Sequence, residues 1–221
     1  MFDRLISLIK EENFKKIESV SVALVGVGGV GGFALEALVR CGVKKILLID
    51  DDVVDLSNLN RQIIATSANI GKYKVDVAVK RAKEIREDIE IKGKVLRINK
   101  DNVDVLRGYQ YIIDACDDIN AKVAMIKFAN KNKIRIVSAL GTGKRLNPEG
   151  IKITKLNKTY NDALARSLRR KLKEEKVDLN IPVVYHESLP LNNDVIVSSS
   201  IFPPAVAGLY LAYYIIDDII K

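Results

Sequence analysis

The segment between residues 26 and 32 has the clearest chemical meaning in this sequence. It reads Gly-Val-Gly-Gly-Val-Gly-Gly, and Gly26, Gly28 and Gly31 match the spacing G-x-G-x-x-G. An apolar run precedes it and a helical pattern follows it, which is the context in which this spacing indicates a phosphate-binding turn. Without side chains the backbone turns tightly, and a phosphate can approach the amide groups at the start of the helix. The segment, Gly29 included, therefore predicts an adenine-nucleotide site.

A carboxylate follows at the distance that a bound nucleotide would need. Asp50 lies 19 residues after Gly31, at the end of the next apolar run, residues 45–50. In nucleotide-binding sheets a carboxylate at this point accepts hydrogen bonds from the ribose hydroxyls. The glycines and Asp50 together do not distinguish NAD from ATP.

The residues after Asp50 favour a triphosphate. Arg61, Lys74 and Asn58 offer donors and positive charge to phosphate groups, and Asp52 and Asp117 offer oxygen ligands to Mg²⁺. Asp117 comes just after the fourth apolar run, so we expect it at the same sheet edge as the glycines. A nicotinamide site needs few charges around its pyrophosphate, whereas reaction at a triphosphate needs cations and a metal-binding carboxylate. The pattern predicts ATP with Mg²⁺.

Alternating periods in the first 140 residues predict the elements that position these side chains. The predicted strands cover residues 20–26, 45–50, 91–98, 109–114 and 134–139, and the predicted helices cover 30–41, 73–87 and 120–132. Short apolar runs separated by helices are typical of βαβ units and of a parallel sheet buried on both faces. Right-handed crossovers then make the sheet doubly wound. We predict an α/β, Rossmann-like, mainly parallel sheet.

The C-terminal third has a different pattern. Residues 151–156 predict a strand that starts a second layer, residues 181–185 another strand, and residues 162–176 a helix with a cationic face. Residues 205–216 predict a buried apolar helix, which follows Pro203 and Pro204 and is closed by Asp217 and Asp218.

The organisation of the chain predicts a single ATP-binding domain. We see no repeat and no low-complexity linker in the 221 residues. The expected domain covers residues 1–221, with a core at 18–145 and a C-terminal extension at 146–221.

Composition excludes several classes of site and partner. One histidine, His186, and two cysteines, Cys41 and Cys116, exclude a multi-histidine metal centre and a disulfide framework, and point to a reducing compartment. The N-terminus does not resemble a signal peptide, and the longest apolar run, 201–216, is shorter than a bilayer span of about 20 residues. We expect a cytoplasmic protein without membrane association. The net charge of +8 suits a polyanionic partner, but also simple solubility.

As an ordered set, the motifs resemble those of the ubiquitin-activating-like adenylyltransferases, the superfamily that includes the molybdopterin and thiamine biosynthesis enzymes. They are G-x-G-G-x-G, I-D-x-D, S-N-L-x-R-Q, G-x-x-K and D-x-x-D, within about residues 20–145. Within the superfamily the chain is most similar to the tRNA threonylcarbamoyladenosine dehydratases. The similar segments are residues 60–65, 140–143, 158–162 and the basic stretch 165–170.

The resemblance implies a role for each matching residue. It implies that Asp50 holds the ATP ribose, that Asn58, Arg61 and Lys74 bind the phosphates and stabilise the transition state, and that Asp117 ligates Mg²⁺. Asp52 is a second candidate ligand.

The resemblance also implies a homodimer. An N-terminal arginine reaches into the partner's site in this family, and Arg4 is the one candidate before the first predicted strand. Two family features are missing from the sequence. No paired C-x-x-C motif is present, so we expect no zinc, and no cysteine after Cys116 offers a thioester-forming thiol.

The expected reaction starts with a substrate carboxylate that attacks the α-phosphate of ATP. A carboxylate is ionised at neutral pH, so no general base is required. The resemblance implies that the carboxylate is the threonyl group of threonylcarbamoyladenosine in tRNA, and that the modified base then cyclises with net loss of water. The helix at 162–176 carries Arg166, Arg169, Arg170 and Lys173 on one face, either as a stripe that binds tRNA phosphates or as a solvated surface.

Two alternatives remain at this point. The first is adenylylation of the C-terminal glycine of a ubiquitin-like sulfur-carrier protein, which would make a sulfur-relay protein a partner. The second is an NAD-dependent oxidoreductase, which leaves Arg61, Lys74 and Asp117 without a role.

Overall fold

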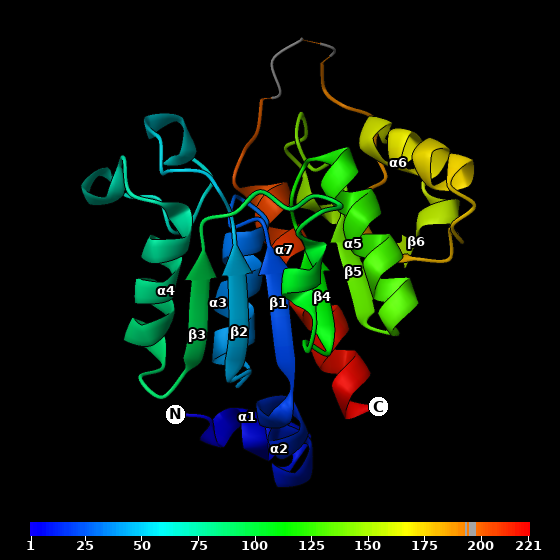
Figure 1. Ribbon diagram of the computed structural model, residues 1–221. Helices are drawn as coiled ribbons and strands as arrows, with labels where there is room; N and C mark the ends of the chain where they lie inside the picture. The colour runs from blue at the N-terminus through cyan, green and yellow to red at the C-terminus, as the bar shows by residue number, and fades with distance from the viewer. Residues whose placement is uncertain (193, 195–197) are drawn as a thin grey trace.

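The structure, a computed structural model, describes residues 1–192, 194 and 198–221. Its strands form one sheet in the order β3-β2-β1-β4-β5-β7-β6 (Figure 1). The strands are β1 Ser21–Val25, β2 Lys45–Ile49, β3 Glu90–Lys94, β4 Tyr111–Asp114, β5 Arg135–Ala139, β6 Ile151–Lys155 and β7 Pro182–His186. All neighbouring pairs are parallel except β6 and β7. The prediction of a doubly wound, mainly parallel α/β sheet is confirmed.

Helices cover both faces of the sheet. The α-helices of the structure are α1 Asp3–Ile9, α2 Glu11–Ser19, α3 Gly31–Arg40, α4 Lys74–Ile85, α5 Ile119–Asn132, α6 Ala163–Glu174 and α7 Phe202–Ile220. One core contains residues of α3, α4 and α7, and the other contains residues of α5 and α6. The chain therefore changes face between β1 and β4. In such sheets the crevice beyond the carboxyl ends of the strands at this switch point binds the ligand.

Burial explains where the strands end. All five residues of β1 are buried, as expected for a central parallel strand. In β3 only Ile91 is buried, because this strand lies at the edge of the sheet. The strand consequently ends at Lys94, four residues before the predicted end.

Two predictions about the C-terminal third are wrong. Strand β6 does not start a second layer, because its backbone pairs with β7 and extends the same sheet. Helix α7 does not close at Asp217 and Asp218, because the Asp218 carboxylate accepts a hydrogen bond from the Tyr111 hydroxyl at 2.8 Å and pairs with Arg135. These partners offset its charge in the last turn of the helix. Within the described ranges no helix has the length and apolar character that a bilayer span requires.

The two N-terminal helices, which the sequence analysis did not identify, lie at the amino ends of the strands (Figure 1). Helix α2 buries Phe14 and Ile17, whereas α1 buries no residue. The Arg86 guanidinium lies 5.0 Å from the Phe2 ring centroid and bonds Glu18 at 2.5 Å, which attaches this end of the chain to the body of the protein.

Candidate nucleotide-binding site

The glycine turn joins β1 to α3, and two of its glycines are required by sterics. Gly26 has a φ of 89°, and a Cβ there would lie 2.7 Å from the Ala115 carbonyl. A Cβ on Gly31 would lie 1.8 Å from the Gly26 oxygen. At Gly28 and Gly29 a Cβ would meet nothing closer than 3.4 Å. These two glycines are not needed for packing, and they leave the backbone open to close approach by a ligand.

Asp50 directly follows β2, and its carboxylate connects the glycine turn to the segment that begins after this strand. Its Oδ2 accepts a hydrogen bond from the Val27 amide at 2.6 Å, and its Oδ1 accepts one from the Asp52 amide at 2.9 Å. Burial raises the pKa of Asp50, and the two backbone bonds and the Lys74 charge only partly oppose this. Each oxygen keeps a second lone pair for a ribose hydroxyl. Asp50 thus also shapes the turn, a role the sequence did not indicate.

Lys74, the first residue of α4, is only 5% exposed. Its Nζ lies 2.7 Å from Asp52 Oδ2, and its amide donates to the Asp52 carbonyl at 3.0 Å. The structure therefore engages Asp52, a candidate Mg²⁺ ligand, in an ion pair with Lys74. The Asp52 side chain is 66% exposed, so the pair lies at the boundary between protein and solvent.

Asn58 and Arg61 belong to one tight turn after β2. Asn58 is buried, and its Oδ1 accepts a hydrogen bond from the Asp55 amide at 3.1 Å. The Arg61 Nη1 donates to the Ser57 carbonyl at 2.6 Å and to Asn60 Oδ1 at 3.0 Å. Both acceptors are neutral, and within the described residues no carboxylate pairs with Arg61. Its positive charge can therefore meet an anion.

Asp117 lies three residues beyond the end of β4 and is exposed. The adjacent Asp118 caps α5 and bonds Arg97 at 2.9 Å. That bond raises the pKa of Arg97, and the charges of Asp51 and Asp117 add to the effect. In the described part of the chain, the carboxylates close enough to share one cation are Asp50, Asp51 and Asp52, with oxygens within 4.8 Å of one another. Asp117 is outside that group, although its oxygen chemistry suits Mg²⁺.

Gln62 is a residue of this site to which the sequence analysis assigned no role. It is 6% exposed, and its Oε1 has no hydrogen-bond partner among the described residues. Its Nε2 lies 3.7 Å from where a Cβ on Gly28 would be. A buried unpaired polar atom costs about 1–3 kcal/mol, and such atoms concentrate where function or an unseen ligand explains them. The signal was its place in the Asn-Arg-Gln motif, next to Arg61.

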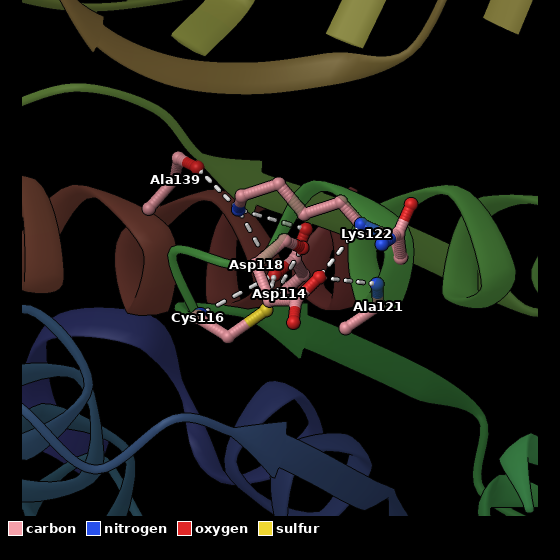
Figure 2. Close-up of polar contacts among 7 residues, drawn as sticks. Asp114, Cys116, Asp118, Ala121, Lys122 and Ala139 are labelled. Atoms are coloured by element: carbon pink, nitrogen blue, oxygen red, sulfur yellow. Dashed lines mark hydrogen bonds and ion pairs between the residues drawn. The ribbon is translucent and has the colours of Figure 1, made fainter. Parts of the chain in front are cut away.

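A buried ion pair joins the end of β4 to α5, the two elements that the loop with Asp117 connects (Figure 2). Lys122 Nζ bonds both oxygens of Asp114, at 3.0 and 3.1 Å, and the Ala139 carbonyl at 2.7 Å. Both side chains are fully buried. The Cys116 thiol donates to Asp114 at 3.2 Å, and burial, together with the Asp114 charge, raises the pKa of Cys116 far above its ordinary range. Cys116 is therefore a protonated thiol and is not activated as a nucleophile.

Arg4 lies far from the glycine turn of its own chain. It is an exposed residue of α1, beyond the amino ends of the strands, whereas the glycine turn leaves the carboxyl end of β1 (Figure 1). The structure does not bring Arg4 together with the other predicted site residues. A role for Arg4 therefore requires another subunit.

Helix α6 carries the predicted cationic stripe with one exception. Arg166, Arg170 and Lys173 are exposed. Arg169 instead donates to the Thr159 carbonyl at 3.0 Å and also to the Thr159 hydroxyl. The preceding turn therefore holds Nη1 of Arg169, and the side chain is only partly exposed, unlike the other three cations.

Comparisons with known proteins identify a family and relatives for this chain. The model of the ThiF family matches residues 2–188. The tRNA threonylcarbamoyladenosine dehydratase of Bacillus subtilis (strain 168) is 31% identical over an alignment of 240 residues, gaps included. The alignment covers 100% of this chain and 94% of that protein. The enzyme of the same name from Escherichia coli (strain K12) is 38% identical over 170 residues, 76% of this chain and 63% of that protein. The crystal structure of the E. coli tRNA N6-threonylcarbamoyladenosine dehydratase in complex with ATP superposes with a TM-score of 0.94, at 31% identity, covering 99% of this chain and 93% of that chain.

Proposed function

Because this chain belongs to the ThiF family, we propose that it is an ATP-dependent enzyme that adenylylates a carboxylate. We propose further that the carboxylate is the threonyl group of threonylcarbamoyladenosine in tRNA, and that the modified base then cyclises with net loss of water. The observation that carries the proposal is the cluster formed by the glycine turn, Asp50, Lys74 and Arg61 at the switch point of the sheet. Almost the whole chain shares its fold with a dehydratase whose structure was solved with ATP.

The described elements suggest how the reaction proceeds. The glycine turn and the start of α3 face the phosphates, and Asp50 accepts bonds from the ribose. A carboxylate oxygen of the substrate attacks the α-phosphorus, and the bond to pyrophosphate breaks. Arg61 and Lys74 stabilise the charge that develops on the pentacoordinate phosphorus, and Asn58 orients the phosphates. The acyl carbon is then attacked from within the same modified base, which closes the ring and releases AMP.

We propose that Asp117 ligates Mg²⁺ at this site. Its exposed carboxylate has the oxygen chemistry that Mg²⁺ prefers, and Asp52 is a weaker candidate because Lys74 engages one of its oxygens. Bound Mg²⁺ would neutralise phosphate charge. The described elements pack on a single sheet, which supports the proposal that residues 1–221 act as one ATP-binding domain. We place its activity in the cytoplasm, with its tRNA substrate.

The function is tested with ATP and tRNA from cells that lack the activity. After incubation, mass spectrometry of the nucleosides should show threonylcarbamoyladenosine replaced by a product lighter by one water, and AMP should accumulate in proportion. Omission of ATP should leave the nucleoside unchanged. Release of pyrophosphate and formation of an acyl-adenylate with a Gly-Gly-terminated carrier protein, but not with tRNA, would support the sulfur-carrier alternative. Tight NAD binding without ATP binding would support the oxidoreductase.

We expect the exposed cations of α6 to contribute to tRNA binding. Replacing Arg166, Arg170 and Lys173 with glutamine should weaken tRNA affinity and reduce the slope of log K against log salt by roughly 2–3, if each contacts one phosphate. Titrations at several salt concentrations measure this, with calorimetry to check that ATP binding is retained. The matched control replaces three exposed lysines at the opposite side of the sheet, Lys80, Lys83 and Lys92. An equal loss in both triple variants would assign the effect to net charge alone.

We propose that the protein works as a homodimer in which Arg4 enters the partner's site. The outer face of α7 exposes Phe202, Leu209 and Tyr213, which together offer an apolar contact surface. Arg4→Ala and Lys74→Ala should each be nearly inactive, and mixing the two should restore activity, because subunit exchange creates some intact sites. Sedimentation measures the oligomeric state. A fully active monomer would contradict both the dimer and the role of Arg4.

A further inference from the structure

Tyr160 stands half exposed in the turn that leads into α6. It is 51% exposed, and its hydroxyl donates to Glu187 Oε2 at 2.6 Å. Its ring meets the buried Tyr185 ring at a centroid distance of 6.0 Å and an interplanar angle of 79°. Single exposed aromatic residues are common and need no explanation in themselves. Tyr160 differs because its hydroxyl and its contact with Tyr185 hold the ring in one orientation while half of its surface stays open.

The turn around Tyr160 is equally well held. Asn161 has a φ of 54°, and its Nδ2 donates to the Glu187 carbonyl at 3.0 Å. Its own carbonyl accepts a bond from the buried Arg145 at 2.9 Å. Asp162 accepts bonds from the Gly141 amide and from the Ala165 amide, both at 2.8 Å, and so caps α6.

These contacts place the turn at the carboxyl edge of the sheet. Gly141 follows the carboxyl end of β5, and Glu187 follows the carboxyl end of β7. The glycine turn leaves the carboxyl end of β1, which is separated from β5 by β4 alone. The open tyrosine is therefore on the same edge as the proposed catalytic site.

The charges around the ring suit a polyanion. Among the described residues, Glu187 is the acid that the ring's hydroxyl contacts, and Lys152 pairs with it at 2.5 Å. The hydrogen bonds from Lys152 and Tyr160 lower the pKa of Glu187, so it remains a paired carboxylate at neutral pH. Lys158 and Arg166, on either side of the turn, are exposed. An open aromatic ring flanked by exposed cations is the combination that proteins use for unpaired nucleotides, because the ring stacks on a base and the cations follow the backbone.

We propose that Tyr160 is a stacking platform for an unpaired base of the RNA substrate. This inference rests on the proposed function. A ring that is already oriented loses little conformational entropy on binding, which favours such a role. Stacking uses the face that every base has, so Tyr160 would hold the single-stranded region near the reacting base without reading its identity.

A single-tryptophan reporter tests the proposal, because the chain has no tryptophan of its own. The Tyr160→Trp variant is titrated with an RNA stem-loop whose loop is unpaired, and with a fully paired RNA of the same length. We expect the stem-loop, and not the duplex, to quench the emission. The control is Tyr213→Trp, on the outer face of α7, whose emission should stay unchanged. Equal quenching by both RNAs, or none in Tyr160→Trp, would overturn the platform.

Affinity provides the second measurement. Tyr160→Leu should weaken stem-loop binding about 5- to 150-fold at every salt concentration, with an unchanged salt slope, because stacking is not a charge interaction. Tyr160→Phe keeps the ring and should bind like the wild type, and ATP binding by both variants verifies the fold. Wild-type affinity in Tyr160→Leu, or a changed slope, would contradict the proposal. Failure of the wild-type protein to bind RNA would instead contradict the proposed function.

Discussion

Replacing Lys74 with alanine is expected to lower kcat for adenylylation about 100- to 1,000-fold, the usual cost of losing one donor to a developing charge. Lys74 is almost completely buried at the start of α4, and Asp52, its ion-pair partner among the described residues, is largely exposed. The ammonium group can therefore also bind a phosphate oxygen without leaving a buried acid unpaired. Because the α-phosphate gains charge only in the transition state, KM for ATP should change much less than kcat.

Steady-state kinetics and the rate of pyrophosphate release in a single turnover measure this effect. The matched control is Lys72→Ala, which removes an exposed lysine two residues earlier and should keep wild-type kcat. The melting temperature of Lys74→Ala should stay close to that of the wild type, because Asp52 remains solvated. A raised KM with unchanged kcat would make Lys74 a residue of ground-state binding only.

Replacing Lys122 with methionine is expected to destabilise the protein by about 3–5 kcal/mol, because it leaves the buried Asp114 carboxylate without a countercharge. For a chain of this size each kcal/mol corresponds to roughly 2–4 °C, so Tm should fall by about 6–20 °C. Calorimetry or circular dichroism measures the shift. The loop that carries Asp117 connects Asp114, the last residue of β4, to α5, which carries Lys122, so the variant should also lose affinity for ATP–Mg²⁺ when assayed well below its Tm.

Two further variants identify the cause. The double variant Asp114→Leu with Lys122→Met removes both charges and should recover most of the lost stability, as is observed when buried pairs are replaced by apolar residues. Lys127, also in α5, forms a half-exposed pair with Glu175 at the end of α6, and Lys127→Met should cost at most about 1 kcal/mol. If Lys122→Met melts like the wild type, the pair contributes nothing to the fold.

The pH dependence of the buried pair has a defined sign. Burial by itself lowers the pKa of Lys122, but the Asp114 carboxylate outweighs it, so the pKa is raised overall. A raised lysine pKa means that the stabilisation is complete at neutral pH and below the lysine's unfolded-state pKa, and is lost only as the pH rises through the raised value. The pair should therefore not limit stability in the neutral range.

The sequence by itself determined the doubly wound core and indicated most residues of the candidate nucleotide site. Local hydrophobic periodicity reports burial, and the runs around β1, β2 and β4 are buried on both faces, so their apolar character is continuous. The carboxyl ends of parallel strands share one edge, so the glycine turn, Asp50 and Asp117 had to lie at that edge.

The tertiary structure alone decided which of these side chains meet. Periodicity does not show that Lys122 points inward to Asp114, because lysine is normally a surface residue and the partner lies on another element. It also does not show that Arg169 binds the Thr159 carbonyl, or that Lys74 engages Asp52.

The sequence also did not predict that β6 joins the same sheet or that Arg4 lies far from the glycine turn of its own chain. Each depends on contacts between segments that are distant along the chain. A local sequence pattern indicates how deeply a residue is buried, but it does not identify the residues against which it packs. The packing of helices and strands therefore decides which strand edge is open and which backbone carbonyl a side chain can reach.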